Sequence, residues 1–357
     1  MTAANAVAVI LVIGVTMYAT FGGADFGAGL WSLLAGGGDR GRRPRELIDW
    51  AIGPVWEANH VWLIFVLVVL WTGFPSAFES IFSTLFIPLS LAAFGIVLRG
   101  SGFAFQHTAR RARGRALATA VFGAASVLTP FFLGTVVGAI AGGRVPVGNA
   151  AGDAVTSWLN TLSLVTGALF VATGAYLASV FLVSDARRAG TPDLERYFSD
   201  RALIAASVTG ALAAVGLVAL HADARTVFDG LTSDGLPLVV LSVVCGFAVI
   251  VLLRRGARRG ARLLAVGAVA AVIWGWAVAQ HPYLLPPSLT ISDAAAAHTT
   301  LISVLIVFAV AVAFVLPALG LLFTLVQRDL VQETSQPTTE EGGAVRDPVR
   351  LPPRSTS

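Results

Sequence analysis

The sequence contains no lysine, only one cysteine, and few charged residues among its 357 positions. Charged side chains make up 12% of the chain, whereas 56% of the residues are hydrophobic. The lone Cys245 excludes a disulfide within the chain and a thiolate metal cluster built by this chain alone. Every basic residue is an arginine, and the arginines cluster between apolar runs, so the formal charge of +4 does not indicate a nucleic-acid partner.

Apolar runs of about 20 residues recur along the whole chain, which is the length that a membrane-spanning helix requires. The sequence therefore predicts an all-α integral membrane protein with nine transmembrane helices. Their expected ranges are residues 5–34, 50–73, 77–98, 116–141, 158–183, 202–220, 236–253, 262–280 and 299–326.

The placement of arginine predicts the orientation of these spans. Arginines are frequent in every second connection and after the last span, whereas the other connections hold only Arg144 and Arg225. Arginine is retained on the cytoplasmic side, so the N-terminus is expected outside and the C-terminus in the cytoplasm. The first span lacks a basic leading region and is expected to be kept rather than cleaved. Residues 328–357 are predicted to form a disordered cytoplasmic tail.

The second predicted span begins with an unusual polar segment, Gly-Pro-Val-Trp-Glu-Ala-Asn-His-Val-Trp-Leu, at residues 53–63. An ionisable group in a span costs at least ~2.5–3.5 kcal/mol on insertion scales. With a rise of 1.5 Å per residue, Glu57 would lie ~10 Å and His60 ~15 Å into the membrane from the cytoplasmic side. Asp25 falls near the cytoplasmic end of the first span, at a similar level. The two acids are predicted to form a proton-entry element, and simple hydrogen bonding to neighbouring helix ends is the alternative.

Two metal hypotheses follow from the histidines. Glu57 and His60 have the Glu-x-x-His spacing of di-metal bundles, but such a site needs a second copy and two further glutamates, which the sequence lacks. An embedded histidine can also ligate haem. However, His221, His281 and His298 map to outer span ends and His107 to a cytoplasmic loop, so no metal site is predicted and haem binding is not required.

The combination of motifs resembles subunit II of the cytochrome bd quinol oxidases. The motifs look closer to those of the cyanide-insensitive branch of this family. The motifs are Gly-Ala-Asp-Phe-Gly-Ala-Gly at 23–29, the segment 53–64, Gly73-Phe74-Pro75, and Leu-Arg-Gly-Ser-Gly-Phe at 98–103. The resemblance implies two four-helix bundles plus one peripheral helix. The expected divisions are a first bundle at 1–143, a second at 144–281, the ninth helix at 282–327 and the tail at 328–357.

The same resemblance implies a partner and an activity. In that family a haem-bearing subunit I carries the b and d haems and the quinol site, and a small third subunit often joins. The complex, in the bacterial cell inner membrane among its lipids, oxidises quinol and reduces O2 to water. This chain is expected to hold no haem and to be inactive alone, although a structural quinone in its apolar interior is compatible with the sequence.

The resemblance also suggests roles for individual residues. It implies that Glu57 delivers protons towards the oxygen-reducing haem, and that Asp25 supports this entry, with Asn59 and His60 beside them. Trp62 matches a tryptophan near a proposed oxygen path, and plain packing is its alternative. Arg99 is expected at the cytoplasmic end of the third span, either snorkelling to the interface or paired with an acid. Glu79 belongs to no motif and is expected to be solvated.

Two other function classes remain open from sequence. An ion-coupled secondary transporter would show matched broken helices in both halves. The polar residues are instead concentrated in the first three spans. A purely structural membrane subunit is the second alternative, in which Asp25 and Glu57 serve assembly only.

Overall fold

The structure is a computed structural model that describes residues 2–327 except 37, 53–55, 109–111 and 258. Within helices, the side chains of 38–40, 52, 56–58, 106–108, 112, 115, 315, 316 and 318–327 also lie outside the description. The predicted tail at 328–357 falls outside the described residues.

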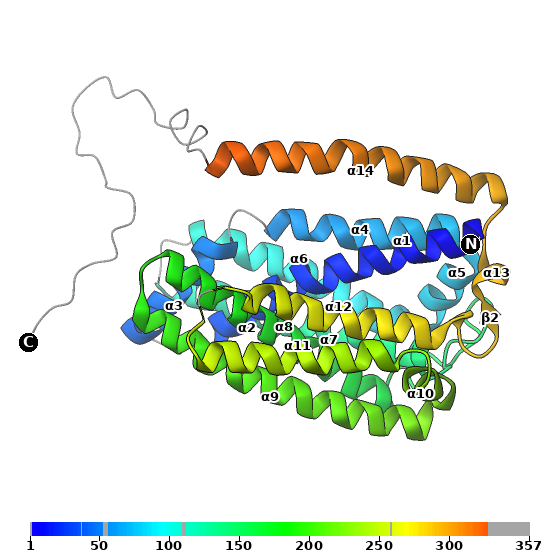
Figure 1. Ribbon diagram of the computed structural model, residues 1–357, viewed down its shortest axis with the longest axis horizontal. Coiled ribbons are helices and arrows are strands. Elements are labelled where there is room, and N and C mark those ends of the chain that lie inside the picture. The colour runs from blue at the N-terminus through cyan, green and yellow to red at the C-terminus, as the bar shows by residue number, and fades with distance from the viewer. Residues whose placement is uncertain (1, 37, 53–55, 109–111, 258, 328–357) are drawn as a thin grey trace, which may run out of the picture. The chain divides into compact units, whose positions relative to one another are not determined.

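The described chain is almost entirely helical, which confirms the predicted all-α class (Figure 1). The elements are α1 (Ala3–Met17), the π-helix η1 (Tyr18–Gly22), α2 (Gly23–Leu34), α3 (Gly38–Ile52), α4 (Trp56–Gly73), α5 (Pro75–Thr84), α6 (Phe86–Thr108), α7 (Ala112–Ala141), α8 (Thr161–Arg188), α9 (Pro192–Asp223), α10 (Arg225–Thr232), α11 (Leu236–Arg254), α12 (Ala261–Gln280), β1 (Tyr283–Leu285), β2 (Leu289–Thr290), α13 (Ile291–Ala294) and α14 (His298–Gln327). The two strands pair antiparallel, with Tyr283 opposite Thr290.

Seven helices in the described part of the chain are long and apolar enough to cross a membrane. They are α1–η1–α2 as one continuous helix over Ala3–Leu34, the Phe86–Phe105 part of α6, the Ala116–Ala141 part of α7, and α8, α9, α11 and α12. The pair formed by α4 and α5 passes the same test together, but it is bent by 118°. The described part of α14, His298–Phe314, is apolar but shorter.

The prediction for the third span is wrong in its bounds. Instead of one helix over 77–98, α5 ends at Thr84 and α6 begins at Phe86 and continues to Thr108. Pro88 explains the break, because a proline ring collides with the carbonyl four residues earlier, here that of Thr84, if the helix runs through. Arg99 therefore lies in the interior of a helix and not at its end.

The arginine-rich connection after the first span contains a helix, α3. Its Leu47 and Ile48 are buried against the core around α8, while Arg42 points to solvent. Arg45 donates to the Ser32 and Gly36 carbonyls at the end of α2, and Arg43 pairs with Asp193 in the first turn of α9. These contacts fix α3 against two helix ends.

Residues 1–304 form one compact unit, and the chain from Leu305 onwards forms a second. Within the first unit, α8 is the central helix, since it contacts α2, α3, α7, α9 and α12. Helices α2 and α8 approach each other closely, because a Cβ on Gly27 would overlap the backbone of Gly174. The division into two bundles at residue 143 stays a prediction.

The short helix α5 lies at the opposite end of the first unit from α3 (Figure 1), and it is held by hydrogen bonds from a neighbouring loop. Gly148 donates its backbone N–H to the Ser80 hydroxyl at 3.0 Å, and Ala150 donates to the Ser83 hydroxyl at 2.8 Å. These bonds hold the bent α4–α5 pair against the segment that joins α7 to α8.

Candidate functional site

The described residues contain one fully buried pair of opposite charges, Asp25 on α2 and Arg99 on α6. The guanidinium donates to both carboxylate oxygens, at 2.9 and 2.7 Å, and to the Asp25 carbonyl at 3.2 Å. Arg99 is 1% exposed and Asp25 is 4% exposed. The arrangement is the two-pronged geometry that arginine makes with carboxylates, and it excludes snorkelling for Arg99.

Three further side chains complete what we call the Arg99 cluster, which consists of Asp25, Phe26, Arg99, Phe122 and Ser126. The Arg99 Nε donates to the Ser126 hydroxyl at 2.9 Å. The guanidinium carbon lies 4.9 Å from the ring centroid of Phe26 and 4.8 Å from that of Phe122. A cation between two aromatic rings is stabilised by their negative faces.

The local sequence explains how Asp25 reaches this position. The helix from Ala3 to Leu34 contains a π-helical segment, Tyr18–Gly22, just before α2 begins. A π-bulge inserts an extra residue per turn and so rotates the following residues around the helix axis. The Thr20 hydroxyl donates to the Thr16 carbonyl at 2.8 Å within this segment. Gly29 then permits the close approach of Ser126, because a Cβ at that position would overlap the serine hydroxyl.

The beginning of α4 lies beside this cluster. The ring of His60 meets that of Phe26 edge to face, with the centroids 6.1 Å apart. Asn59 is buried, with 8% of its surface exposed. Glu57 lies in the first turn of α4, one turn before His60, and its side chain is outside the described residues. The structure thus brings α4 to Phe26, and a contact between Glu57 and Asp25 stays a prediction.

Trp62 and Glu79, the remaining predicted residues, are not members of the Arg99 cluster. Trp62 packs edge to face on Phe65, with centroids 6.1 Å apart, on the part of α4 that follows His60. Glu79 on α5 is exposed, as expected.

A second ionic cluster, in the later half of the chain, was missed by the sequence analysis. Asp185 near the end of α8 is 7% exposed and accepts from Arg262 of α12 at 3.1 and 3.2 Å, and it also pairs with Arg188. Arg187 pairs with Glu195 of α9 at 2.7 Å. An acid three residues before an arginine at a predicted span end was the available signal. These pairs join the arginine-rich ends of α8, α9 and α12.

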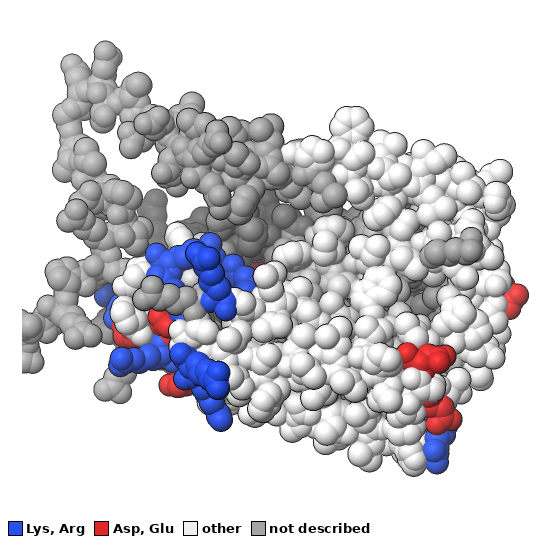
Figure 2. Space-filling view, viewed as in Figure 1, with Lys and Arg blue, Asp and Glu red and all other residues white. Residues whose placement is uncertain are grey.

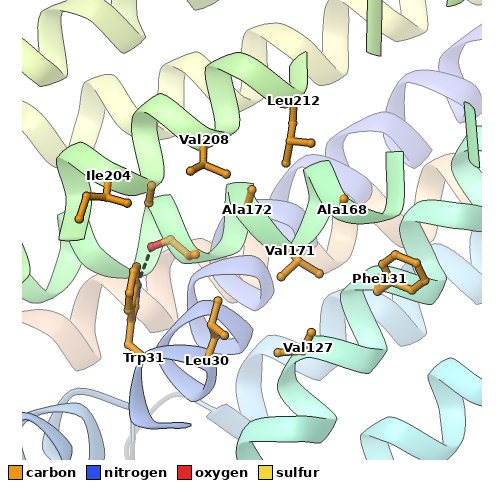
Figure 3. Close-up of a pocket in the computed structure, with 12 residues that line it drawn as sticks. Leu30, Trp31, Val127, Phe131, Ala168, Val171, Ala172, Ile204, Val208 and Leu212 are labelled. Atoms are coloured by element: carbon orange, nitrogen blue, oxygen red, sulfur yellow. Dashed lines mark hydrogen bonds between the residues drawn. The ribbon is translucent and has the colours of Figure 1, made fainter. Parts of the chain in front are cut away.

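An apolar groove of about 390 Å³ runs between α2, α7, α8 and α9 (Figure 3). Trp31 and Leu30 of α2 lie at one end, and Phe131 and Leu212 lie near the other. The Trp31 indole donates to the Ala175 carbonyl of α8 at 2.8 Å, which holds the ring at its place.

Metal ligands do not gather in the part of the chain that the structure describes, where no group of three or more His, Cys, Asp or Glu side chains could hold an ion. Among these residues, His60, His221, His281 and His298 lie on four different segments.

Comparison with known proteins identifies a family. The family model of cytochrome bd terminal oxidase subunit II matches residues 3–326. The chain is similar to a putative cytochrome bd menaquinol oxidase subunit II of Bacillus subtilis (strain 168), with 22% identity over 88% of this chain and 93% of the relative. A cytochrome bd ubiquinol oxidase subunit 2 of the same organism is 30% identical over 31% of this chain and 32% of its own length. The solved bd oxidase of Geobacillus thermodenitrificans superposes with a TM-score of 0.73 at 26% identity, covering 91% of this chain and 98% of that chain.

Proposed function

Because the chain belongs to the cytochrome bd terminal oxidase subunit II family, we propose that its part in the quinol:O2 oxidoreductase complex is to bring cytoplasmic protons towards the haem site of a partner subunit I. Membership makes the chain one subunit of a multisubunit respiratory enzyme in a membrane. The alternative of a secondary transporter is not favoured by these matches.

The proposed topology has nine spans, with the N-terminus outside and the C-terminus in the cytoplasm of a bacterial cell. The proposal counts the seven long helices, the bent α4–α5 pair as one span, and α14 as the ninth span. Figure 2 shows arginines gathered at one end of the first unit. Exposed arginines in α3, at the end of α8 and at or after the end of α11 are Arg42, Arg188, Arg254, Arg255 and Arg259. Such an end is the expected cytoplasmic face.

The contact between His60 and Phe26 is the observation that carries the proton proposal. Because Phe26 belongs to the Arg99 cluster, this contact supports a position for the start of α4 near the only fully buried ion pair among the described residues. A carboxyl at the start of a helix that enters the membrane is within reach of water on that side. Glu57 is therefore proposed as the inlet, with His60 and Asn59 lining the next step inward.

Asp25 has a different part in this proposal from the one suggested by sequence. Arg99 occupies both of its carboxylate oxygens, so protonating Asp25 would require breaking a buried pair. We assign Asp25 the role of a fixed anion, neutralised by Arg99, that lines the route near Phe26. Trp62 as an oxygen-path residue stays a prediction that rests on the family resemblance.

Haem groups transfer electrons from quinol to O2 in this class of enzyme, and we assign them to the partner. The described histidines lie on separate segments, and the groove of Figure 3 has no histidine, cysteine or methionine in its lining. These residues do not fit a haem, so no step of the reaction is assigned to such a group here. A small third subunit and a structural quinone stay predictions.

A purely structural role is the second candidate, and the complete pairing of Asp25 by Arg99 favours it for that residue. The discriminating experiment is Glu57→Gln in the purified complex, with turnover and proton uptake measured across pH. A proton inlet predicts a turnover loss of roughly 100-fold, the range of lost acid–base catalysis. The matched control is Glu79→Gln, which removes an exposed carboxylate on α5.

Normal turnover and an unchanged pH profile in Glu57→Gln would reject the inlet while leaving the subunit assignment intact. Equal losses in Glu57→Gln and Glu79→Gln would also reject it, because the effect would then not depend on the position of the carboxyl.

A further inference from the structure

The groove between α2, α7, α8 and α9 has a cation at one of its ends. Arg201 of α9 places its guanidinium carbon 5.9 Å from the ring centroid of Trp31, which lines that end, and 3.2 Å from the ring centroid of Tyr197. Ile204 and Val208, three and seven residues later, lie on the same helix face and line the groove. The charged end and the apolar floor are thus parts of one continuous surface.

Arg201 differs from four arginines near it in the fold, which lie on α3, α8 and α12 and are paired with acids. Arg43, Arg187, Arg188 and Arg262 each contact a carboxylate. In the described part of the chain, Arg201 has no carboxylate partner within ion-pair distance, and it donates to the Tyr197 carbonyl at 3.0 Å. Its guanidinium, partly exposed, retains donors for an external anion.

The groove opens on the side that faces away from the helix core. Ile204 is 61% exposed and Val208 is 46% exposed, whereas Ala172, Ala175 and Ala205 on its floor are buried. From Ile204 to Leu212 the groove follows α9 for ~12 Å, which is most of one leaflet of a bilayer whose apolar core is ~30 Å thick. Its length and lining match a hydrocarbon chain aligned with the helices.

We propose that this groove binds one anionic phospholipid, with an acyl chain along α9 and the phosphate at Arg201. The cation distinguishes this occupant from a quinone, whose head group carries no charge for Arg201 to pair with. Arg201 lies in the first part of α9, whose initial turns pair with Arg43 of α3 and Arg187 of α8, and an anionic leaflet surface attracts such basic side chains. The proposal concerns lipid and is independent of the role of Glu57.

Native mass spectrometry of the purified complex after mild delipidation tests this site with phosphatidylglycerol and phosphatidylcholine as probes. Wild-type complex is expected to retain one phosphatidylglycerol and to release phosphatidylcholine. Arg201→Gln is expected to weaken phosphatidylglycerol binding roughly fivefold, the effect of one arginine near an anionic head group. Val208→Trp, which fills the groove, is expected to abolish it.

Two variants on the same helix serve as matched controls. Arg196→Gln removes an exposed arginine away from the groove lining, and Val218→Trp adds the same bulk at a position that is 71% exposed. Both are expected to bind like wild type. Equal retention of the two lipids, equal binding in Arg201→Gln, or a bound quinone in place of phospholipid would overturn the proposal. The comparison of the two lipids on wild type needs no variant to fold.

Discussion

Arg99 meets the carboxylate of Asp25 through two N–H···O bonds, although the residues lie 74 positions apart in the chain. Either charge alone inside an apolar helix assembly would be strongly unfavourable. Together they neutralise each other, and Ser126 and the rings of Phe26 and Phe122 satisfy the rest of the guanidinium. The pair therefore couples the position of α2 to that of α6.

Breaking this pair is expected to destabilise the protein more than losing an exposed arginine. Arg99→Gln and Asp25→Asn should each lower the free energy of unfolding by about 3–5 kcal/mol, because each leaves one buried charge without its partner. The double variant should be less affected than the sum of the two singles. Thermal unfolding of the purified complex measures this, with Arg144→Gln, an exposed arginine, as control. Additive losses would contradict the pairing.

Removing the Ser126 hydroxyl should have a smaller effect on the same cluster. Ser126→Ala deletes the acceptor of the Arg99 Nε, and hydrogen bonds to charged groups contribute about 1.5–3 kcal/mol. Ser207→Ala is the matched control, since its exposed hydroxyl donates only to the Leu203 carbonyl of its own helix. The midpoint of thermal unfolding should fall for Ser126→Ala alone, and equal shifts would argue against the bond.

Substitution of glycine by alanine is expected to have opposite effects at Gly27, in the contact between α2 and α8, and at Gly210 on α9. Gly27→Ala should prevent close packing, because the added Cβ would overlap the Gly174 carbonyl. Gly210→Ala on α9 meets open space and should be neutral or stabilising by about 0.5–1 kcal/mol, since alanine favours the helix. The yield of assembled complex on size-exclusion chromatography checks both. Normal assembly of Gly27→Ala would show that the helices can separate without loss.

The loop between α7 and α8 is expected to contribute to the stability of the protein in a way that depends on pH. Backbone N–H groups of Thr156 and Val155 bond to the Asp153 carboxylate and lower its pKa below the ordinary 3.8. Because the folded-state pKa is the lower one, the stabilisation is present above the unfolded pKa. It is lost as the pH falls through the folded pKa. The difference in melting temperature between wild type and Asp153→Asn should be constant at neutral pH and shrink in acid. A difference that grows in acid would have the wrong sign.

The sequence was sufficient for the fold class because membrane spans leave a compositional signal that does not depend on tertiary contacts. Residues 5–34 were predicted as the first span, and the helix covers Ala3–Leu34. The predicted bounds of the third span were wrong because hydropathy is continuous across Leu85, whereas the break in the helix is caused by backbone sterics at Pro88. Proline alone is not decisive, since Pro130 lies inside α7 without ending it.

The candidate site was only partly predictable for a similar reason. Asp25 and Arg99 stood out as charges in apolar helices, but their pairing depends on the packing of α2 against α7 and on the π-helical segment at Tyr18–Gly22. Ser126 and Phe122 carry no signal in sequence, because a serine and a phenylalanine in a span are ordinary. The pairing of Asp185 with Arg262 could not be predicted because the two residues lie 77 positions apart, although Arg188, three residues after Asp185, was a local signal.

The facing glycines of α2 and α8 also constrain how this chain can change over generations. A Cβ at Gly27 would overlap the backbone of Gly174, and a Cβ at Gly174 would crowd the Gly23 carbonyl. Replacing either glycine by a larger residue would therefore give a variant in which α2 and α8 pack badly, whichever of the two positions changed first. Drift at this crossing therefore requires a shift of both backbones together, and lineages that keep the crossing should keep its glycines.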